Sequence, residues 1–304
     1  MANFTVMGWN QLVKMVSGAG TPTTVPVTDY NVGINQAPDV PDLVSGKSDR
    51  YVFSLGKIEV QGTINAPLTS LVGDTLVANA IGLAEDPSLY ITCQTSAYGY
   101  FSITGARVNR LTVSANEGEP INISAEIWGV GDWSGSSAPT SRLVDQEVTT
   151  AQAGYILEGF APSEIAQQVY QIPMFDQVTG AENLLPVTNG VVTSVEIVID
   201  NKLQRNYVLG STQGLDAYSI SAGQRLVTGR VSWQSSATGY FDFITGAGTG
   251  TATNLVNFAD VFSINLAAGR LLFGATPPPV NVNKLVGEAD FTVLTDKPGS
   301  FVVS

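Results

Sequence analysis

The chain has 304 residues, of which 44% are hydrophobic and only 13% are charged, and its formal net charge is −12. This length and hydrophobicity fit two ordinary domains or one large domain, and they exclude a disordered protein. The negative charge excludes nucleic-acid binding by phosphate neutralisation. The charged share is about half the usual ~25%, which favours a protein whose surface is largely hidden in an assembly.

Residue types that carry common catalytic chemistry are missing. The sequence contains no histidine and a single cysteine, Cys93. Ser-His-Asp and Cys-His catalysis are therefore excluded, together with imidazole metal ligands. We expect Cys93 to be a small buried thiol, because one cysteine forms no disulfide within the chain. We also expect no signal peptide and no membrane span, since no suitable apolar segment is present.

The first fifty residues contain one helical signal and one extended stretch. Asn10 is placed to cap a short helix over residues 11–16. Residues 17–50 are rich in Gly, Thr, Pro and Asn, and prolines favour extended backbone in the residues before them. Such a long irregular stretch is uncommon inside a compact domain. We expect either an arm or hairpin that packs on a neighbouring molecule, or a loose loop.

Residues 56–81 change from strand periodicity to helix periodicity. Ile58, Val60 and Ile64 alternate with polar residues, which predicts a half-buried strand that ends at Pro67. Apolar residues then recur every three to four positions, which predicts an amphipathic helix over residues 68–80, capped by Thr69 or Ser70.

Residues 108–128 give the clearest prediction of the sequence. Apolar residues alternate on both sides of the turn at residues 116–119, where Gly118 is available for a positive φ. This pattern predicts a β-hairpin. Two further strands are expected just before it, at residues 90–95 and 98–104.

The second half of the chain is also predicted to be β-structure. Residues 129–150 form a linker or surface loop, and residues 201–214 form a polar connection. Strands are expected at residues 191–199, 219–233 and 285–294, and a second hairpin is expected at residues 258–273 around Gly269.

Three stretches recur in the same order along the chain. Residues 56–64 match residues 223–231, residues 99–105 match residues 239–246, and residues 111–121 match residues 262–272. We interpret the matches as a duplicated β-domain, with chance similarity between strands as the alternative. The predicted division is an N-terminal segment and arm (1–50), a first domain (51–150), a connecting segment (151–190) and a second domain (191–304).

No group of residues forms a convincing active site. Turn charges explain Glu117 and Glu119 better than a carboxylate pair does, and Asp200 with Asn201 is interpreted as a turn or cap. The acidic residues near residue 80 lack calcium-loop spacing, and the glycines of residues 246–250 lack the lysine of a phosphate loop. Trp128 and Trp233 are interpreted as core or interface residues. We predict no catalytic, cofactor-binding or metal-binding residue.

Two long stretches resemble a known family. The segments SLGKIEVQGTINAPL (54–68) and ARVNRLTVSANEGEPINISAEIWG (106–129) resemble tail tube proteins of tailed bacteriophages, of the long type with duplicated domains. The segments TSVEIVIDNKL (193–203) and AGQRLVTGRVSW (222–233) resemble the same family.

The resemblance implies a mainly β fold with two β-sandwich or partial-barrel domains and a short flanking helix. It also implies that strands of neighbouring subunits join into an inner ring barrel, and that trimeric pseudo-sixfold or hexameric rings stack into a hollow tube. DNA would pass through an acidic lumen that does not hold it. The expected partners are copies of the chain and other tail proteins, such as a sheath, a tail terminator and a baseplate. The expected location is the virion tail, assembled in the host cytoplasm, and no enzymatic activity is expected.

Two other classes of protein remain open at this point. A tail terminator, baseplate hub or capsid decoration protein would share the composition but form closed rings or trimers. A carbohydrate-binding or hydrolytic β-protein would need paired carboxylates or an aromatic platform, and an ordinary share of surface charge.

Overall fold

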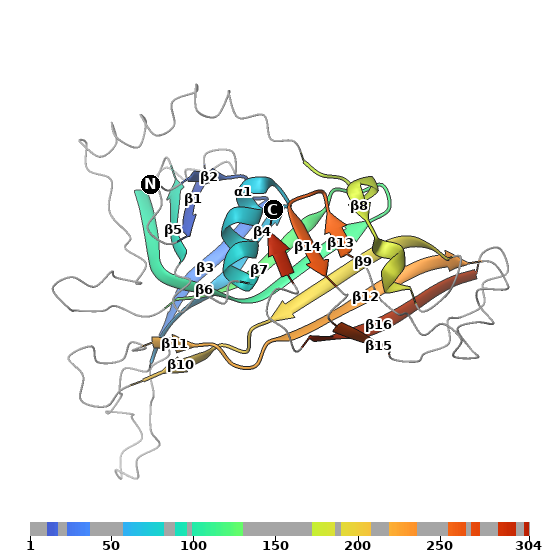
Figure 1. Ribbon diagram of the computed structural model, residues 1–304. Helices are drawn as coiled ribbons and strands as arrows, with labels where there is room; N and C mark the ends of the chain where they lie inside the picture. The colour runs from blue at the N-terminus through green and yellow to red at the C-terminus, as the bar shows by residue number, and fades with distance from the viewer. Residues whose placement is uncertain are drawn as a thin grey trace, which may run out of the picture.

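The fold is mainly β, with one short helix packed against a large antiparallel sheet (Figure 1). It is seen in a computed structural model that describes residues 11–17, 23–36, 57–81, 89–95, 99–129, 172–185, 190–207, 219–235, 255–265, 269–273, 285–295 and 301–303.

The large sheet runs through both halves of the chain. Eight of its strands follow one another antiparallel across both halves, and the halves meet where residues 110–116 pair with residues 194–200. In spatial order the strands are β3 (Asp29–Gln36), β4 (Ile58–Pro67), β7 (Asn122–Gly129), β6 (Gly99–Asn116), β9 (Gly190–Asp200), β12 (Leu226–Ser235), β16 (Leu285–Thr295) and β15 (Gly269–Phe273).

The spatial order repeats after four strands. In the first half β4 lies between β3 and β7, and β7 pairs with β6. In the second half β12 lies between β9 and β16, and β16 pairs with β15. Each half therefore contributes a four-stranded unit of the same connectivity. We call β3-β4-β7-β6 the first unit and β9-β12-β16-β15 the second unit.

The strand β6 belongs to two sheets. Its first part pairs with β5, and its second part pairs with β7 and β9. The remaining described strands form the extension next to β6, a small four-stranded sheet and a two-stranded ribbon. The extension consists of β5 (Leu89–Thr95), β1 (Gln11–Ser17) and β2 (Thr23–Val25). The small sheet consists of β17 (Phe301–Val303), β14 (Phe262–Asn265), β13 (Leu255–Phe258) and β8 (Val178–Thr179). The ribbon pairs β10 (Gln204–Asn206) with β11 (Ser219–Ser221).

One hydrophobic core lies under a single face of the large sheet. Alternate residues of its strands point into this core, since the side-chain period of a strand is two. The helix and the small sheet cover the same face, and their side chains belong to the same cluster. The fully buried sheet residues include Val60, Ile64, Leu111, Val113, Ala125, Ile127, Ile197, Ile199 and Val231.

The helix consists of α1 (Ser70–Val72), a π-helical turn η2 (Gly73–Val77) and α2 (Ala78–Ile81). The hydroxyl of Thr69 accepts a hydrogen bond from the N–H of Val72, so Thr69 is the N-cap, one of the two predicted alternatives. A side chain at Gly73 would overlap Val261 of the β13–β14 turn. This close approach explains a glycine inside the helix. Two 3₁₀ turns, η3 (Phe175–Gln177) and η4 (Ala181–Leu184), precede β9.

Most predicted strands are confirmed. The hairpin of residues 108–128 is β6–β7, and Gly118 in its turn has φ 79°. The expected strands near residues 58, 90, 191 and 285 are β4, β5, β9 and β16. The region of residues 219–233 contains two strands, β11 and β12. The match of residues 239–246 lies outside the described residues.

The helix predicted at residues 11–16 is wrong. Residues Gln11–Ser17 form β1, which pairs with β2 on one side and β5 on the other. A helix this short is marginal by itself. Backbone pairing on both sides, with Val13 only 1% exposed, stabilises the strand instead.

In the stretch of residues 17–50, where we expected an arm, a hairpin or a loose loop, the described residues are strands of the chain's own sheets. β2 pairs with β1, and β3 pairs with β4 over its whole length. The alternation of Tyr30 and Val32 with polar residues is strand periodicity, which the turn-rich composition of the stretch obscured.

The second predicted hairpin, residues 258–273, is wrong because its two strands lie in different sheets. β14 pairs with β13 and β17, whereas β15 pairs with β16. The tight hairpin is β13–β14, turned by Ala259 and Asp260, which both have positive φ. In the strand order β15 therefore holds the place of β6, so the match of residues 262–272 to the hairpin 111–121 was out of register.

Gly62 and Gly229 occupy equivalent sites in β4 and β12. A Cβ at Gly62 would overlap the backbone of Asn31 in the next strand. A Cβ at Gly229 would lie 2.5 Å from the carbonyl oxygen of Glu196 and would overlap the ring of Phe291. Both glycines are therefore required by a close approach of neighbouring strands.

Gly229→Val is expected to lower the free energy of unfolding by about 1–3 kcal/mol, the typical cost of overpacking a core. The matched control is Thr228→Val, which changes the adjacent residue on the opposite face of β12 and is expected to be nearly neutral. Urea unfolding of both variants measures the difference, and equal stabilities would contradict the strand packing described here.

Candidate assembly surfaces

The pairing of β6 with β9, which we call the seam, joins the two units. Arg110–Asn116 pair with Ser194–Asp200 without a bulge. Backbone hydrogen bonds continue beyond both ends, from Glu117 N to Thr193 O (2.9 Å) and from Asn201 N to Asn109 O (2.8 Å). The seam is therefore as regular as the pairings within each unit.

A buried asparagine fastens the seam to the helix. Asn201 is 6% exposed, and its Nδ2 donates to the carbonyl oxygens of Ala80 and Val108, each at 2.9 Å. Arg225 donates from Nε to Asn201 Oδ1 (2.8 Å) and from Nη1 to the carbonyl oxygen of Ile81 (3.1 Å). These donors satisfy carbonyls at the end of the helix. Burial lowers the pKa of Arg225, and the cationic group lies at the favourable end of the helix dipole.

A tight turn follows the seam at Asp200. The Asp200 carboxylate accepts the backbone N–H of Lys202 (2.9 Å) and lies 2.5 Å from its Nζ. Burial raises the pKa of Asp200, but the hydrogen bonds from Lys202 outweigh burial and hold the pKa below its usual value. Lys202 adopts φ 49°, and the turn directs the chain into β10.

Arg205 in β10 reaches from the second half of the chain to the first unit. Its guanidinium lies 4.3 Å from the centre of the Trp128 ring, and Nη2 donates to the carbonyl oxygen of Val60 (3.0 Å). Nη1 is 3.7 Å from the carboxylate of Glu59. The Trp128 indole donates to Glu126 at 2.7 Å, which fixes the ring beneath the guanidinium. We call this set of interactions the Arg205 contact.

The face of the large sheet opposite the core is mostly polar. Serine, threonine, asparagine, glutamine and charged residues predominate there, beside the exposed side chains of Val191, Leu226 and Val286. Carboxylates outnumber cationic groups among the described side chains of this face. Arg230 interacts with Asp290 (2.7 Å) and Glu288 (3.0 Å), and the hydrogen bond to Asp290 is the main cause of its raised pKa.

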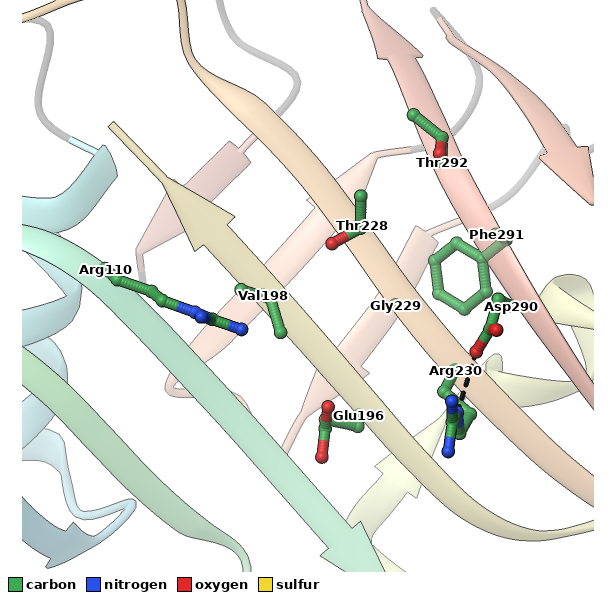
Figure 2. A pocket seen from close by; sticks show the side chains of 9 residues that line it. All are labelled: Arg110, Glu196, Val198, Thr228, Gly229, Arg230, Asp290, Phe291 and Thr292. Carbon is green, nitrogen blue, oxygen red and sulfur yellow. Dashed lines mark hydrogen bonds and ion pairs between the residues drawn. The ribbon is translucent and has the colours of Figure 1, made fainter. Parts of the chain in front are cut away.

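A surface hollow of about 440 Å³ lies on this polar face, over the second unit (Figure 2). Its lining comes from four neighbouring strands, β6, β9, β12 and β16. The residues are Arg110, Glu196, Val198, Thr228, Gly229, Arg230, Asp290, Phe291 and Thr292.

The residues considered for chemistry in the sequence are not brought together. Glu117 and Glu119 lie in the exposed β6–β7 turn, where Asn116 donates to Glu119 at 2.9 Å, and this agrees with their interpretation as turn charges. Trp233 is buried on Gly287 in the core. Cys93 lies in β5, and the side chain is outside the described part. Residues 85, 86 and 246–250 also lie outside it.

Within the part of the chain that the structure describes, no cluster of three or more His, Cys, Asp or Glu is placed to hold a metal ion. No helix there is long and apolar enough to span a bilayer.

The residues that tie the units together were not predicted from the sequence. Asn201 was interpreted as a turn or cap, and Arg205 and Arg225 were not singled out. The sequence contained a partial signal for Asn201, because this asparagine directly follows Asp200 at the end of a predicted strand. Apart from the hydrogen bond between Arg225 and Asn201, their partners lie far away in the chain, between residues 59 and 128, so sequence spacing gives no indication of these contacts.

These features define a class of protein: a mainly β-protein with an extended antiparallel sheet and a network of contacts between its two four-stranded units. The family model described as phage tail tube protein matches residues 11–293, and the chain belongs to this family. It is a structural protein of the phage tail tube and is located in the virion.

Solved structures give a more limited likeness. One chain, from the tail of an empty GTA particle computed with helical refinement in C6 symmetry, has a TM-score of 0.34 and 13% identity. The match covers 44% of this chain and 100% of that one. No curated protein matches the chain.

Asn201→Ala is expected to destabilise the chain by about 1–3 kcal/mol, because the carbonyls of Ala80 and Val108 lose their side-chain donor and Nε of Arg225 loses its acceptor. Asn206→Ala is the matched control: Asn206 is exposed in β10 and bonds only to serine hydroxyls in the described contacts. The control is expected to change stability by less than about 0.5 kcal/mol. Thermal unfolding measures both, and an Asn201→Ala variant as stable as the control would contradict the fastening role.

Proposed function

We propose that copies of this chain join side by side into closed rings, and that the rings stack into the hollow tail tube through which DNA leaves the capsid. The observation that carries the proposal is the repeated strand order of the large sheet. One seam between the two units lies within the chain, and the same kind of seam is available between chains.

The outer edge of the first unit supports this lateral joining. β3 pairs with β4 and with no other described strand. Edge strands of soluble proteins are usually protected by lysine, proline or a bulge. The β3 sequence, DYNVGINQ, contains no lysine and no proline, and its pairing with β4 has no bulge. Such an edge is suited to pair with another chain.

The equivalence of the units indicates which edges meet. β3 holds in the first unit the place that β9 holds in the second, and β15 holds the place of β6. If β3 of one chain pairs with β15 of its neighbour, the contact between the two chains therefore repeats the β6–β9 pairing within each chain. Three chains supply six such units, so we propose a trimeric ring with pseudo-sixfold symmetry. A true hexamer of chains is the alternative.

The same comparison refines the proposed domain division. We keep residues 51–150 and 191–304 as the cores of the two tube domains, joined by residues 151–190. We add β3 to the first domain, because it completes the four-stranded unit.

The polar face of the sheet is proposed to line the lumen. The helix and the small sheet cover the opposite face, so closure of the ring places them outside. Like charges keep DNA from adhering to a wall in which carboxylates predominate. The described carboxylates of this face include Glu59, Glu126, Glu196, Glu288 and Asp290.

The tube is proposed to work without catalysis, with other tail proteins at its ends and, in a contractile tail, a sheath around it. A tail terminator is the second candidate function, because it would use the same lateral edges but stop at a single ring.

We expect the purified chain at high concentration to form hollow tubes in negative-stain micrographs. Native mass spectrometry of intact rings released from these tubes is expected to give three chains per ring. Single rings that never stack would favour the terminator. A chain that stays monomeric, even with preformed tail tips as initiators, would contradict the proposal.

A further inference from the structure

The surface hollow over the second unit has a counterpart in the first unit. In the pairing registers, Gly62 lies opposite Ile127 in β4–β7, and Gly229 lies opposite Phe291 in β12–β16. When these two pairs are aligned, their neighbours on the polar face also correspond. Gln61 takes the position of Thr228, and Trp128 takes the position of Thr292.

In the first unit this position is occupied. The guanidinium of Arg205 lies over Trp128 and is 3.5 Å from Oε1 of Gln61. The side chain of Arg205 is only 7% exposed, so this contact is largely closed to solvent. The ribbon that delivers it, β10–β11, connects β9 to β12 in the next unit along the sheet.

In the second unit the equivalent position is the hollow. Thr228 and Thr292 line it, and all of its lining residues belong to the sheet strands β6, β9, β12 and β16 (Figure 2). The next unit along the sheet at this end belongs to another chain, if rings form as proposed above.

We propose that the hollow is the docking site for a second copy of this chain. The neighbouring copy's first unit reaches over β12 and β16, as β10 of the second unit reaches over β4 and β7 within the chain. This inference rests on the proposed ring. It adds a second lateral contact, made by side chains on the polar face, to the pairing of strand edges.

The chemistry of the hollow defines what fits there. Glu196 and Asp290 supply carboxylates, and Thr228 and Thr292 supply hydroxyls. Arg230 is already paired with Asp290 and Glu288, and it limits the space for a further cation near them. The site therefore accepts a polar segment with hydrogen-bond donors. The second unit has threonine in place of Trp128, so an aromatic–cation stack like that of Arg205 is not formed.

Thr228→Trp tests the proposal by filling the hollow from the half-exposed face of β12. It is expected to raise the protein concentration needed for ring formation by about tenfold or more, since the lost contact enters the association constant directly. Ser124→Trp is the matched control, because Ser124 lies on the same polar face in β7 but not in the hollow. Electron microscopy and sedimentation measure assembly, and circular dichroism checks the fold of each variant.

The outcomes separate the docking site from the ring itself. If the wild-type chain forms no rings, the proposed function fails. If the wild type and both variants assemble equally, only the docking site is wrong.

A photo-crosslinking amino acid at Thr228 gives a second readout that does not depend on disruption. It is expected to produce covalent dimers in assembled rings, with the linked peptide in the first unit of the other copy. Rings that yield only crosslinks within one chain would overturn the proposal, whether or not Thr228→Trp folds.

Discussion

The constraint on which the whole structure depends is that a β-strand edge needs a partner for its backbone N–H and C=O groups. Inside the chain this need is met at the seam, where β6 and β9 join two units of the same strand order. Among the described strands, β3 has a partner on one side only, so the backbone groups on its other side have no partner strand. In the ring that we propose, β3 of one chain would meet this need by pairing with the sheet edge of the next chain.

The seam is more than a row of backbone hydrogen bonds. Asn201 and Arg225 fasten it to the end of the helix, and Arg205 crosses it to reach Trp128. These side chains fix how one unit lies against the next, and in the ring that we propose this geometry would set the curvature of the wall. A tail tube protein needs this geometry to be uniform from unit to unit, since a small error repeated around a ring prevents closure.

The sequence predicted the elements whose signals are local. The β6–β7 hairpin, the Thr69 cap and the strands β4 and β9 follow from alternation and turn residues within about twenty positions. Prediction from the sequence failed where contacts between residues far apart in the chain determine the structure. Gln11–Ser17 is a strand because β2 and β5 lie beside it, and β14 and β15 separate because each finds a different partner. Asn201 and Arg205 were missed for the same reason, since their partners in the first half of the chain are 77 to 146 residues away. The tail tube function was predicted from the family resemblance, and the strand order explains physically how copies of such a chain can join.

Hydrogen–deuterium exchange of β3 before and after assembly measures whether this strand edge is covered by a neighbouring chain. In the unassembled chain Ser194–Asp200 of β9 have a partner strand on both sides and their amides are expected to exchange slowly, whereas alternate amides of β3 lack a partner strand and are expected to exchange faster. Assembly is expected to bring the protection of Asp29–Gln36 to the level of β9. If assembled tubes leave β3 exchanging as fast as in the free chain, the edges of this sheet do not join the ring, and the account is wrong.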